Sequence, residues 1–150
     1  MKNLFDPRDL ESLKTRIAQL RPDSARQWGS MTVAQALAHC TLGVQTATGE
    51  LRPPRKLIGR ILAPMIKSKV VGNDEPMRRN SPTVKETIVQ NEPDFATEQH
   101  RLTASLAQFS TTGPAGCTSH PHAFFGRLTP DEWAILMYKH IDHHLRQFGV

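Results

Sequence analysis

The C-terminal segment of the chain combines a well-marked helix start with two histidines in the middle of an apolar stripe. Thr129-Pro130-Asp131-Glu132 supplies an N-cap residue, a proline at the first helical position and the glutamate of a capping box. Apolar residues then recur at helical spacing: Trp133, Leu136, Met137, Ile141, Leu145 and Phe148. With about 100° between successive residues, His140 and His144 fall within about 20° of the centre of this stripe. The segment therefore predicts a helix whose inward face carries two imidazoles.

Three earlier segments have the same helical periodicity, and their starts are marked as well. Asp6-Pro7 begins the first segment, which Pro22 ends. Thr32 and Gln35 form a capping box for the second. The third follows Pro93. Each of the three has a recurring apolar face, so we expect three more amphipathic helices.

Four helices in a chain of 150 residues, the size of one domain, predict an all-α fold. We expect residues 1–150 to form a single four-helix bundle domain with a long irregular connection between helices 2 and 3. This connection covers about residues 51–92, in which residues 57–66 favour a short helix and Thr87-Ile88-Val89 favours a strand. A connection of this length excludes a simple up-down-up-down order of the helices.

The positive charge of the chain is concentrated in this same connection. The formal net charge is +5, and residues 51–90 contain nine Lys or Arg against three acidic residues. A solvated loop has the same charge pattern, and the segment contains no Phe, Trp or Tyr on which bases could stack. We therefore do not expect nucleic acid as a partner.

Composition and the N-terminal sequence indicate a soluble protein of the cytoplasm. Cys40 and Cys117 are the only cysteines, which is too few for a disulfide framework. The first residues lack the apolar core of a signal peptide, and no run approaches the ~20 apolar residues of a membrane span. Because the hydrophobic fraction is an ordinary 38%, the chain does not need a metal in order to fold. A metal site in it would be functional.

The two inward histidines of the last segment predict a metal site. Residues at i and i+4 lie on one helical face with Cβ atoms about 5–6 Å apart, so His140 and His144 can bind one ion. The alternative is a pair of core histidines, each with its own buried hydrogen-bond partner. His39 on the second helix qualifies as a third ligand, because small residues beside it, among them Gly43, let another helix come close.

Three imidazoles leave at least one coordination position open, which is typical of catalytic sites. Nitrogen ligands suit zinc, nickel, copper or iron. Two further residues are candidates for the surrounding pocket. His122 lies in the loop before the last helix, and the alternative for it is a position on the surface. Gln147 falls near His140 on the helical wheel, and the alternative for it is to cap the end of the helix. Cys40 points away from His39 and is expected in the core.

The histidines lie in stretches that resemble a known family. The stretch His140-Ile141-Asp142-His143-His144-Leu145-Arg146-Gln147 is similar to the H-x-x-x-H pair and the H-H-R-G-Q string of the DinB-like (DinB/YfiT) superfamily of metalloenzymes. Leu145-Arg146 stands where that string has Arg-Gly. Residues 28–40 and His122-Ala123-Phe124-Phe125-Gly126 look like one poorly characterised branch of it. The resemblance spans nearly the whole chain.

The resemblance implies a four-helix bundle with one divalent ion, usually zinc or nickel, in a cavity at its end. It also implies association as a homodimer. The better-understood members of the superfamily are transferases and isomerases that use low-molecular-weight thiols such as bacillithiol or mycothiol.

From the open three-histidine site and the resemblance, we expect a metal-dependent enzyme. The leading hypothesis is a thiol-dependent transferase, in which a metal-bound thiolate attacks a small electrophile. The first alternative is a hydrolase that uses metal-bound water, which calls for a carboxylate general base beside the open position. The second is a non-enzymatic binding module whose basic surface contacts a protein or nucleic acid.

Overall fold

The computed structural model describes residues 1–57 and 67–150, and within them the fold is all-α, as predicted. The long helices are α1 (Pro7–Gln19), α2 (Val33–Thr48), α4 (Phe95–Thr112) and α5 (Pro130–Gln147). Two short 3₁₀ helices, η1 (Lys85–Thr87) and η2 (Gly113–Gly116), lie in the connections, and residues 67–71 are helical. A short helix was expected over residues 57–66, and residues 58–66 of it lie outside the described residues. None of the described helices has the length and apolarity needed to cross a membrane.

The helix ends are set by the residues that mark them in the sequence. The Thr32 hydroxyl accepts a hydrogen bond from the Gln35 backbone, and the Gln35 side chain accepts one from the Thr32 backbone. Thr129 and Glu132 form the same reciprocal pair at the start of α5. Both capping boxes satisfy N–H groups that the first helical turn leaves unpaired. Gly49 ends α2 with a φ of 84°, a left-handed conformation that favours glycine.

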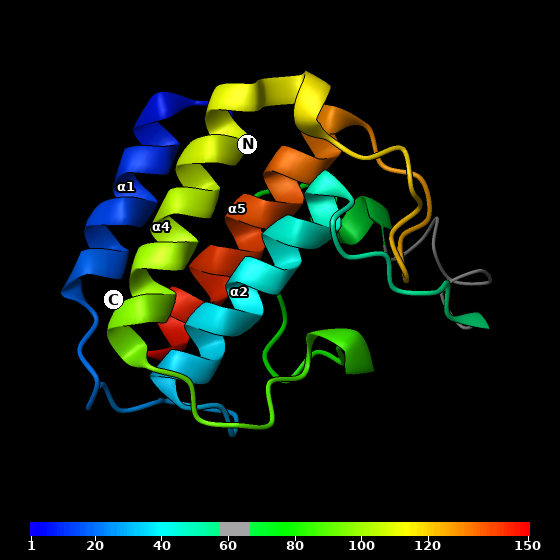
Figure 1. The fold of residues 1–150 in the computed structure, drawn as a ribbon. Coiled ribbons are helices and arrows are strands. Elements are labelled where there is room, and N and C mark those ends of the chain that lie inside the picture. The colour runs from blue at the N-terminus through cyan, green and yellow to red at the C-terminus, as the bar shows by residue number, and fades with distance from the viewer. Residues whose placement is uncertain (58–66) are drawn as a thin grey trace.

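The four long helices bury their apolar faces against one another. α2 contacts α4 and α5, and α1 contacts the same two helices, so that the four lie side by side (Figure 1). Their inward side chains form one hydrophobic cluster, in which Phe109 and Trp133 are the largest fully buried members. Burial of each large apolar side chain contributes about 1.5–3 kcal/mol, which fixes the mutual positions of α2 and α5.

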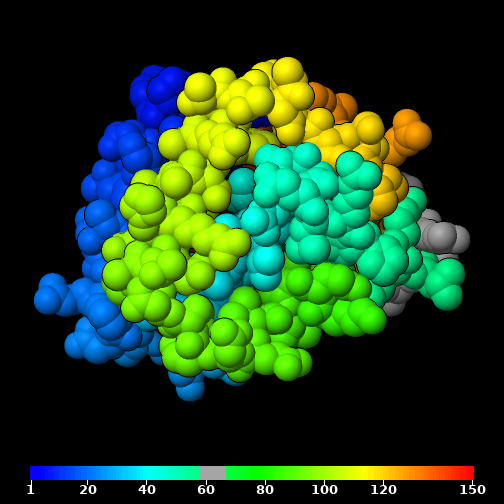
Figure 2. Space-filling view, in the orientation of Figure 1, coloured from blue at the N-terminus to red at the C-terminus, as the bar shows by residue number. Residues whose placement is uncertain are grey.

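The connection between α2 and α4 packs along the flank of α2 (Figure 2). The strand expected at Thr87-Ile88-Val89 is wrong, because Lys85–Thr87 forms η1. The Thr87 hydroxyl donates to the Val84 carbonyl and is hydrogen-bonded to the Thr83 hydroxyl, and these local contacts favour a turn over an extended strand. η1 thereby holds the connection against α2.

Candidate metal centre

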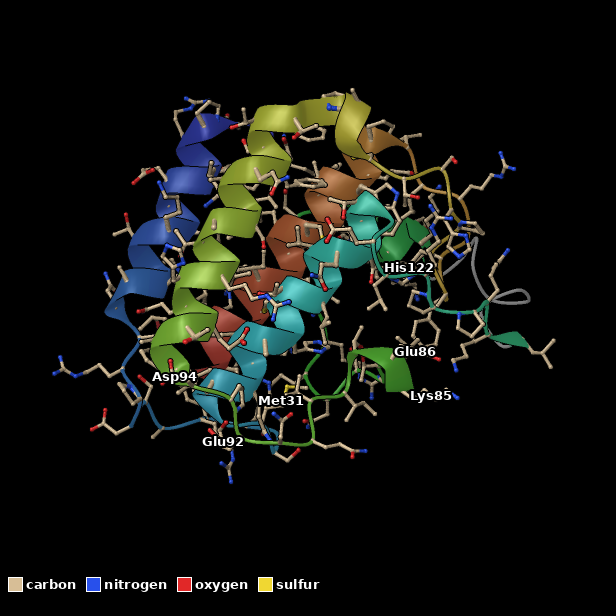
Figure 3. All side chains as sticks on the ribbon, in the orientation of Figure 1. Met31, Lys85, Glu86, Glu92, Asp94 and His122 are labelled. Atoms are coloured by element: carbon tan, nitrogen blue, oxygen red, sulfur yellow. The ribbon has the colours of Figure 1, made fainter. Side chains whose placement is uncertain are left out.

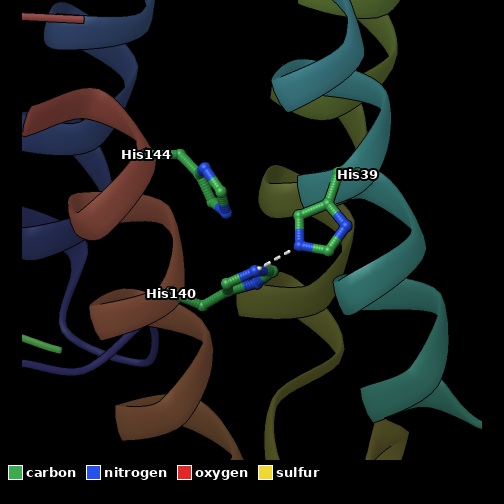
Figure 4. A group of neighbouring side chains, drawn as sticks. All are labelled: His39, His140 and His144. Carbon is green, nitrogen blue, oxygen red and sulfur yellow. Dashed lines mark hydrogen bonds between the residues drawn. The ribbon is translucent and has the colours of Figure 1, made fainter. Parts of the chain in front are cut away.

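α2 and α5 bring three histidines together. His39 projects from α2, and His140 and His144 project from consecutive turns of α5 (Figure 4). One nitrogen from each ring lies within 4.8 Å of the other two. The three ring centroids are 4.8 to 5.0 Å apart, and each pair is arranged edge to face. The side chains expected as ligands therefore meet at one place, and the cluster could hold a metal ion.

The close approach of the two helices depends on Gly43. A Cβ atom at this position would lie 2.8 Å from Nδ1 and 3.0 Å from Cε1 of His140. Such distances are shorter than non-bonded carbon contacts allow, so α2 carries a residue without a side chain where the His140 ring packs. This agrees with the expectation that small residues beside His39 admit another helix.

The orientation of His39 is fixed by the backbone of η1. Its Nδ1 lies 2.8 Å from the carbonyl oxygen of Thr87. A carbonyl oxygen only accepts hydrogen bonds, so Nδ1 carries the proton of the ring. In the neutral imidazole the lone pair is then on Nε2, the atom that lies 2.9 Å from Nε2 of His140. A metal ligand whose other nitrogen donates to a carbonyl is the usual arrangement in metalloproteins.

His144 is fixed in the same way through Gln147. Nδ1 of His144 donates to Oε1 of Gln147 over 2.8 Å, and the Gln147 amide nitrogen donates to the carbonyl oxygen of Trp28 over 2.7 Å. The lone pair of the neutral His144 ring is therefore on Nε2. Gln147 was expected near His140, but its partner is His144, and it is only 3% exposed. It borders the cavity beside the histidines, as predicted, but both ends of its amide are already paired, and it orients an imidazole.

A cavity of about 290 Å³ opens beside the three histidines. His122 and His143 also line it, together with apolar side chains from several segments: Trp28, Met31, Met77, Phe124, Phe125, Trp133 and Met137. Met31 and His122, two members of this wall, lie on the side of α2 that faces away from α1 (Figure 3). Among the described residues, the lining contains no Asp, Glu, Lys, Arg or Cys. A cation bound here would meet neutral walls.

A family model described as "Protein of unknown function (DUF1569)" matches residues 2–149. This chain belongs to the DUF1569 family. No curated protein and no solved structure matches it.

The assignment of the chain to the DinB-like superfamily is wrong, because the family model that matches is DUF1569 and no relationship between the two is shown. The motifs behind the resemblance are short. An H-x-x-x-H pair on one helix and a histidine on a facing helix arise from helical spacing alone, so they do not distinguish one family from another. No activity, metal or partner is therefore taken from that superfamily.

In this DUF1569 protein, burial keeps the histidine cluster neutral. Burial lowers the pKa of His39, an effect that the Thr87 hydrogen bond partly opposes. Burial lowers the pKa of His140 well below its ordinary value and that of His144 to about 3, and neighbouring histidines add to both shifts. Neutral imidazole is the form that binds metals, so no ligand has to lose a proton to solvent at neutral pH.

Three further histidines and Cys40 fall into three groups. His122 and His143 lie in the cavity wall, and His143 also meets the edge of the Trp28 ring at a centroid distance of 5.7 Å. His143 lies off the apolar stripe of α5, but segments outside the long helices cover it partly. Cys40 is 2% exposed in the core, as expected. His100 is exposed on α4.

Proposed function

We propose that the protein is a four-helix bundle metalloenzyme in which His39, His140 and His144 hold one divalent metal ion. The observation that carries the proposal is the convergence of three imidazole nitrogens within 4.8 Å. Two of the rings donate their Nδ1 protons to fixed oxygen atoms, which leaves both Nε2 lone pairs in the cluster. Within the described residues, nothing donates a hydrogen bond to Nε2 of His144.

The donor set suits zinc, nickel, copper or iron, and of these we propose zinc, nickel or iron for the loading experiment. Three neutral nitrogen ligands match the ligand preferences of these ions, and with three protein ligands one position stays open, as in catalytic sites. When bound, the ion would act as a Lewis acid that lowers the pKa of a thiol or water in that position.

We further propose that the ligand in the open position is a small thiol, held as thiolate. The supporting observation is the neutral cavity wall, whose described residues include no carboxylate that could take a proton from water. A bound ion would lower the pKa of either ligand, and a thiol, with a free pKa of about 8.5 against about 15.7 for water, needs the smaller shift to reach its reactive anion. The alternative hydrolase would need such a carboxylate as its general base.

The proposed reaction is the transfer of a carbon group to sulfur. The thiol loses its proton to solvent, and the sulfur lone pair attacks an electrophilic carbon of the second substrate. A carbon–sulfur bond forms while the bond from carbon to its leaving group breaks, and the leaving group departs with the electron pair. The apolar cavity wall would hold the body of the electrophile and exclude water from the reacting atoms.

Metal analysis tests the first part of the proposal. The purified protein should contain close to one equivalent of metal, or take it up on loading with zinc, nickel or iron. The double variant His140→Ala/His144→Ala should lose it. His100→Ala removes an exposed histidine and should retain it. Absence of metal from the loaded wild-type protein would overturn the proposal and favour a binding module.

Cobalt substitution tests the choice of ligand. The Co(II)-loaded protein, titrated with glutathione, cysteine and mercaptoethanol, should develop the near-ultraviolet absorption of a sulfur–cobalt bond. A dinitrophenyl halide added afterwards should consume the thiol and release halide in equal amounts. Absence of the sulfur–cobalt band with every thiol, with ester hydrolysis in its place, would replace the transferase by the hydrolase.

A further inference from the structure

The loop between α4 and α5 holds His122 in one orientation. The His122 backbone N–H donates to the Gly126 carbonyl over 2.8 Å, and the Gly126 N–H donates back over 3.1 Å. Gly126 has a φ of 72°, which closes this tight loop and favours glycine. Inside the loop, Nδ1 of His122 accepts hydrogen bonds from the backbone N–H groups of Phe124 and Phe125, at 3.1 and 3.3 Å.

These contacts decide which nitrogen of His122 carries the proton. Two backbone N–H groups point at Nδ1, so Nδ1 must present its lone pair, and the neutral ring carries its hydrogen on Nε2. Burial lowers the pKa of His122 to about 4, which keeps the ring neutral at physiological pH. The lone pair is therefore used within the loop. His122 can donate a hydrogen bond from Nε2, but it cannot act as a general base.

The Nε2–H group of His122 has no acceptor among residues 1–57 and 67–150. It is not enclosed, unlike the indole nitrogen of Trp133, which is fully buried and also has no acceptor among these residues. The ring of His122 stacks on Phe125 with centroids 4.5 Å apart and meets the edge of Trp133 at 5.6 Å. Both His122 and Trp133 line the cavity beside the histidine cluster.

We propose that His122 forms a subsite that binds an oxygen atom of the substrate, with the Trp133 ring as its apolar wall. The Nε2–H group is an N–H donor without an acceptor among the described residues, and it stands in an apolar wall. A carbonyl or carboxylate oxygen on a small apolar molecule would accept its hydrogen bond. This inference rests on the proposed function, because that function places the electrophilic substrate in this cavity. An oxygen attached next to the reacting carbon would gain negative charge during the attack, and the Nε2–H group of His122 would stabilise it.

The tautomer of His122 is the first test, and it does not depend on a metal. Histidine side-chain ¹⁵N NMR of the metal-free protein at pH 7 should show His122 protonated on Nε2. His39 and His144 serve as internal references, because both should be protonated on Nδ1. A His122 ring protonated on Nδ1 would overturn the proposal.

Ligand binding is the second test. Toluene, benzamide and benzoate present the same ring with no acceptor, a carbonyl oxygen and a carboxylate. Their binding can be measured by NMR titration in the metal-free and the zinc-loaded protein. At least one of the two acceptors should bind about tenfold more tightly than toluene in both forms, the gain expected from one hydrogen bond. Equal binding of all three probes would overturn the proposal, and the better acceptor identifies the oxygen class.

A substitution separates His122 from the metal. His122→Asn keeps an acceptor for the Phe124 and Phe125 N–H groups and removes the Nε2–H donor. It should abolish the preference over toluene and leave the zinc content unchanged, whereas His122→Gln, with an amide N–H nearer the former Nε2, should restore part of it. An undiminished preference in His122→Asn would overturn the proposal. If the wild-type protein prefers an acceptor probe over toluene but binds no metal, the proposed function alone is refuted.

Discussion

The Nε2 atoms of His39 and His140 lie 2.9 Å apart, and Thr87 decides which of the two carries a proton. His39 uses its Nδ1 proton for the Thr87 carbonyl, so its Nε2 can only accept. Nε2 of His140 must then be the donor in the metal-free protein. A metal ion bound by the same two atoms requires a lone pair on both. Metal binding would therefore replace one hydrogen bond of the cluster and move the His140 proton.

This relationship predicts a tautomer change confined to one histidine. In the metal-free protein His140 should be protonated on Nε2, and with one equivalent of zinc it should be protonated on Nδ1. His39 and His144 should be protonated on Nδ1 in both states, because their partners are oxygen acceptors. Histidine ¹⁵N NMR at pH 7.5 measures all three rings. An unchanged His140 at full zinc occupancy would show that Nε2 of this residue is not a ligand.

Gln147 should control the affinity for metal without touching the ion. Gln147→Met removes both the acceptor for His144 and the donor to Trp28 while keeping the size of the side chain. The free His144 ring can then rotate, and we expect zinc affinity to fall about 10–100-fold. Competition with a chromophoric chelator measures this loss. Gln108→Met replaces an exposed glutamine of α4 and should leave the affinity unchanged.

A methyl group at position 43 should displace the His140 ring. In Gly43→Ala the new Cβ would overlap Nδ1 of His140 at 2.8 Å, so zinc affinity should fall at least about tenfold. Alanine also has the better helix propensity, which by itself favours folding by about 1 kcal/mol. In the His140→Ala background the same change meets no ring, and it should raise the free energy of unfolding. Urea unfolding of the wild type, the two single variants and the double variant gives the coupling free energy between positions 43 and 140. Additive effects would show that the ring does not pack on Gly43.

The sequence predicts the helices because their signals are local. Thr32 with Gln35 and Thr129 with Glu132 satisfy N–H groups within one turn, so each capping box works whatever surrounds it. The predicted strand at Thr87 failed for the opposite reason. Its β-branched residues favour an extended chain only if a partner strand exists, and here contacts with α2 and local hydroxyl bonds determine the conformation.

The candidate site was predictable in its side chains but not in the atoms that orient them. Helical spacing places His140 and His144 on one face, and the small residue at 43 indicates where a second helix approaches. The carbonyl groups of Thr87 and Trp28 lie 48 and 119 positions from the residues that they hold. Every residue has a backbone carbonyl group, so no residue type in the sequence indicates which carbonyl will orient a histidine. Of the cavity wall, the sequence indicated His122 and Gln147, and both lie there.

A partly buried ion pair should contribute more to stability than an exposed one. Asp142 is 8% exposed and pairs with Arg16 and with Arg146, both at 2.7 Å. Asp142→Asn leaves Arg16 without its charged partner and should lower the free energy of unfolding by about 2 kcal/mol. Glu11→Gln breaks the exposed pair with Lys14 and should cost less than about 0.5 kcal/mol. Urea unfolding at pH 7 compares them, and equal losses would contradict this ranking.

The buried histidines should make the metal-free protein sensitive to acid. The pKa of His144 is lowered to about 3 and that of His122 to about 4, whereas both are near 6.5 in the unfolded chain. The unfolded chain therefore binds more protons below pH 6.5, and stability is complete above that pH. It should fall by about 1.4 kcal/mol per pH unit for each such histidine as the pH drops toward the folded-state pKa.

Urea unfolding in the presence of a chelator at pH 7, 6 and 5 measures this loss. At pH 5, His122 and His144 together should remove about 4 kcal/mol, a large share of the stability of a typical domain. Because His122→Asn removes one of the two groups, the slope below pH 6 should decrease by about 1.4 kcal/mol per pH unit in this variant. His100→Ala removes an exposed histidine and should leave the slope unchanged. If the stability of the wild type is constant from pH 7 to 5, these rings are protonated in the folded protein as readily as in the unfolded chain. The cavity would then be too polar to keep them neutral.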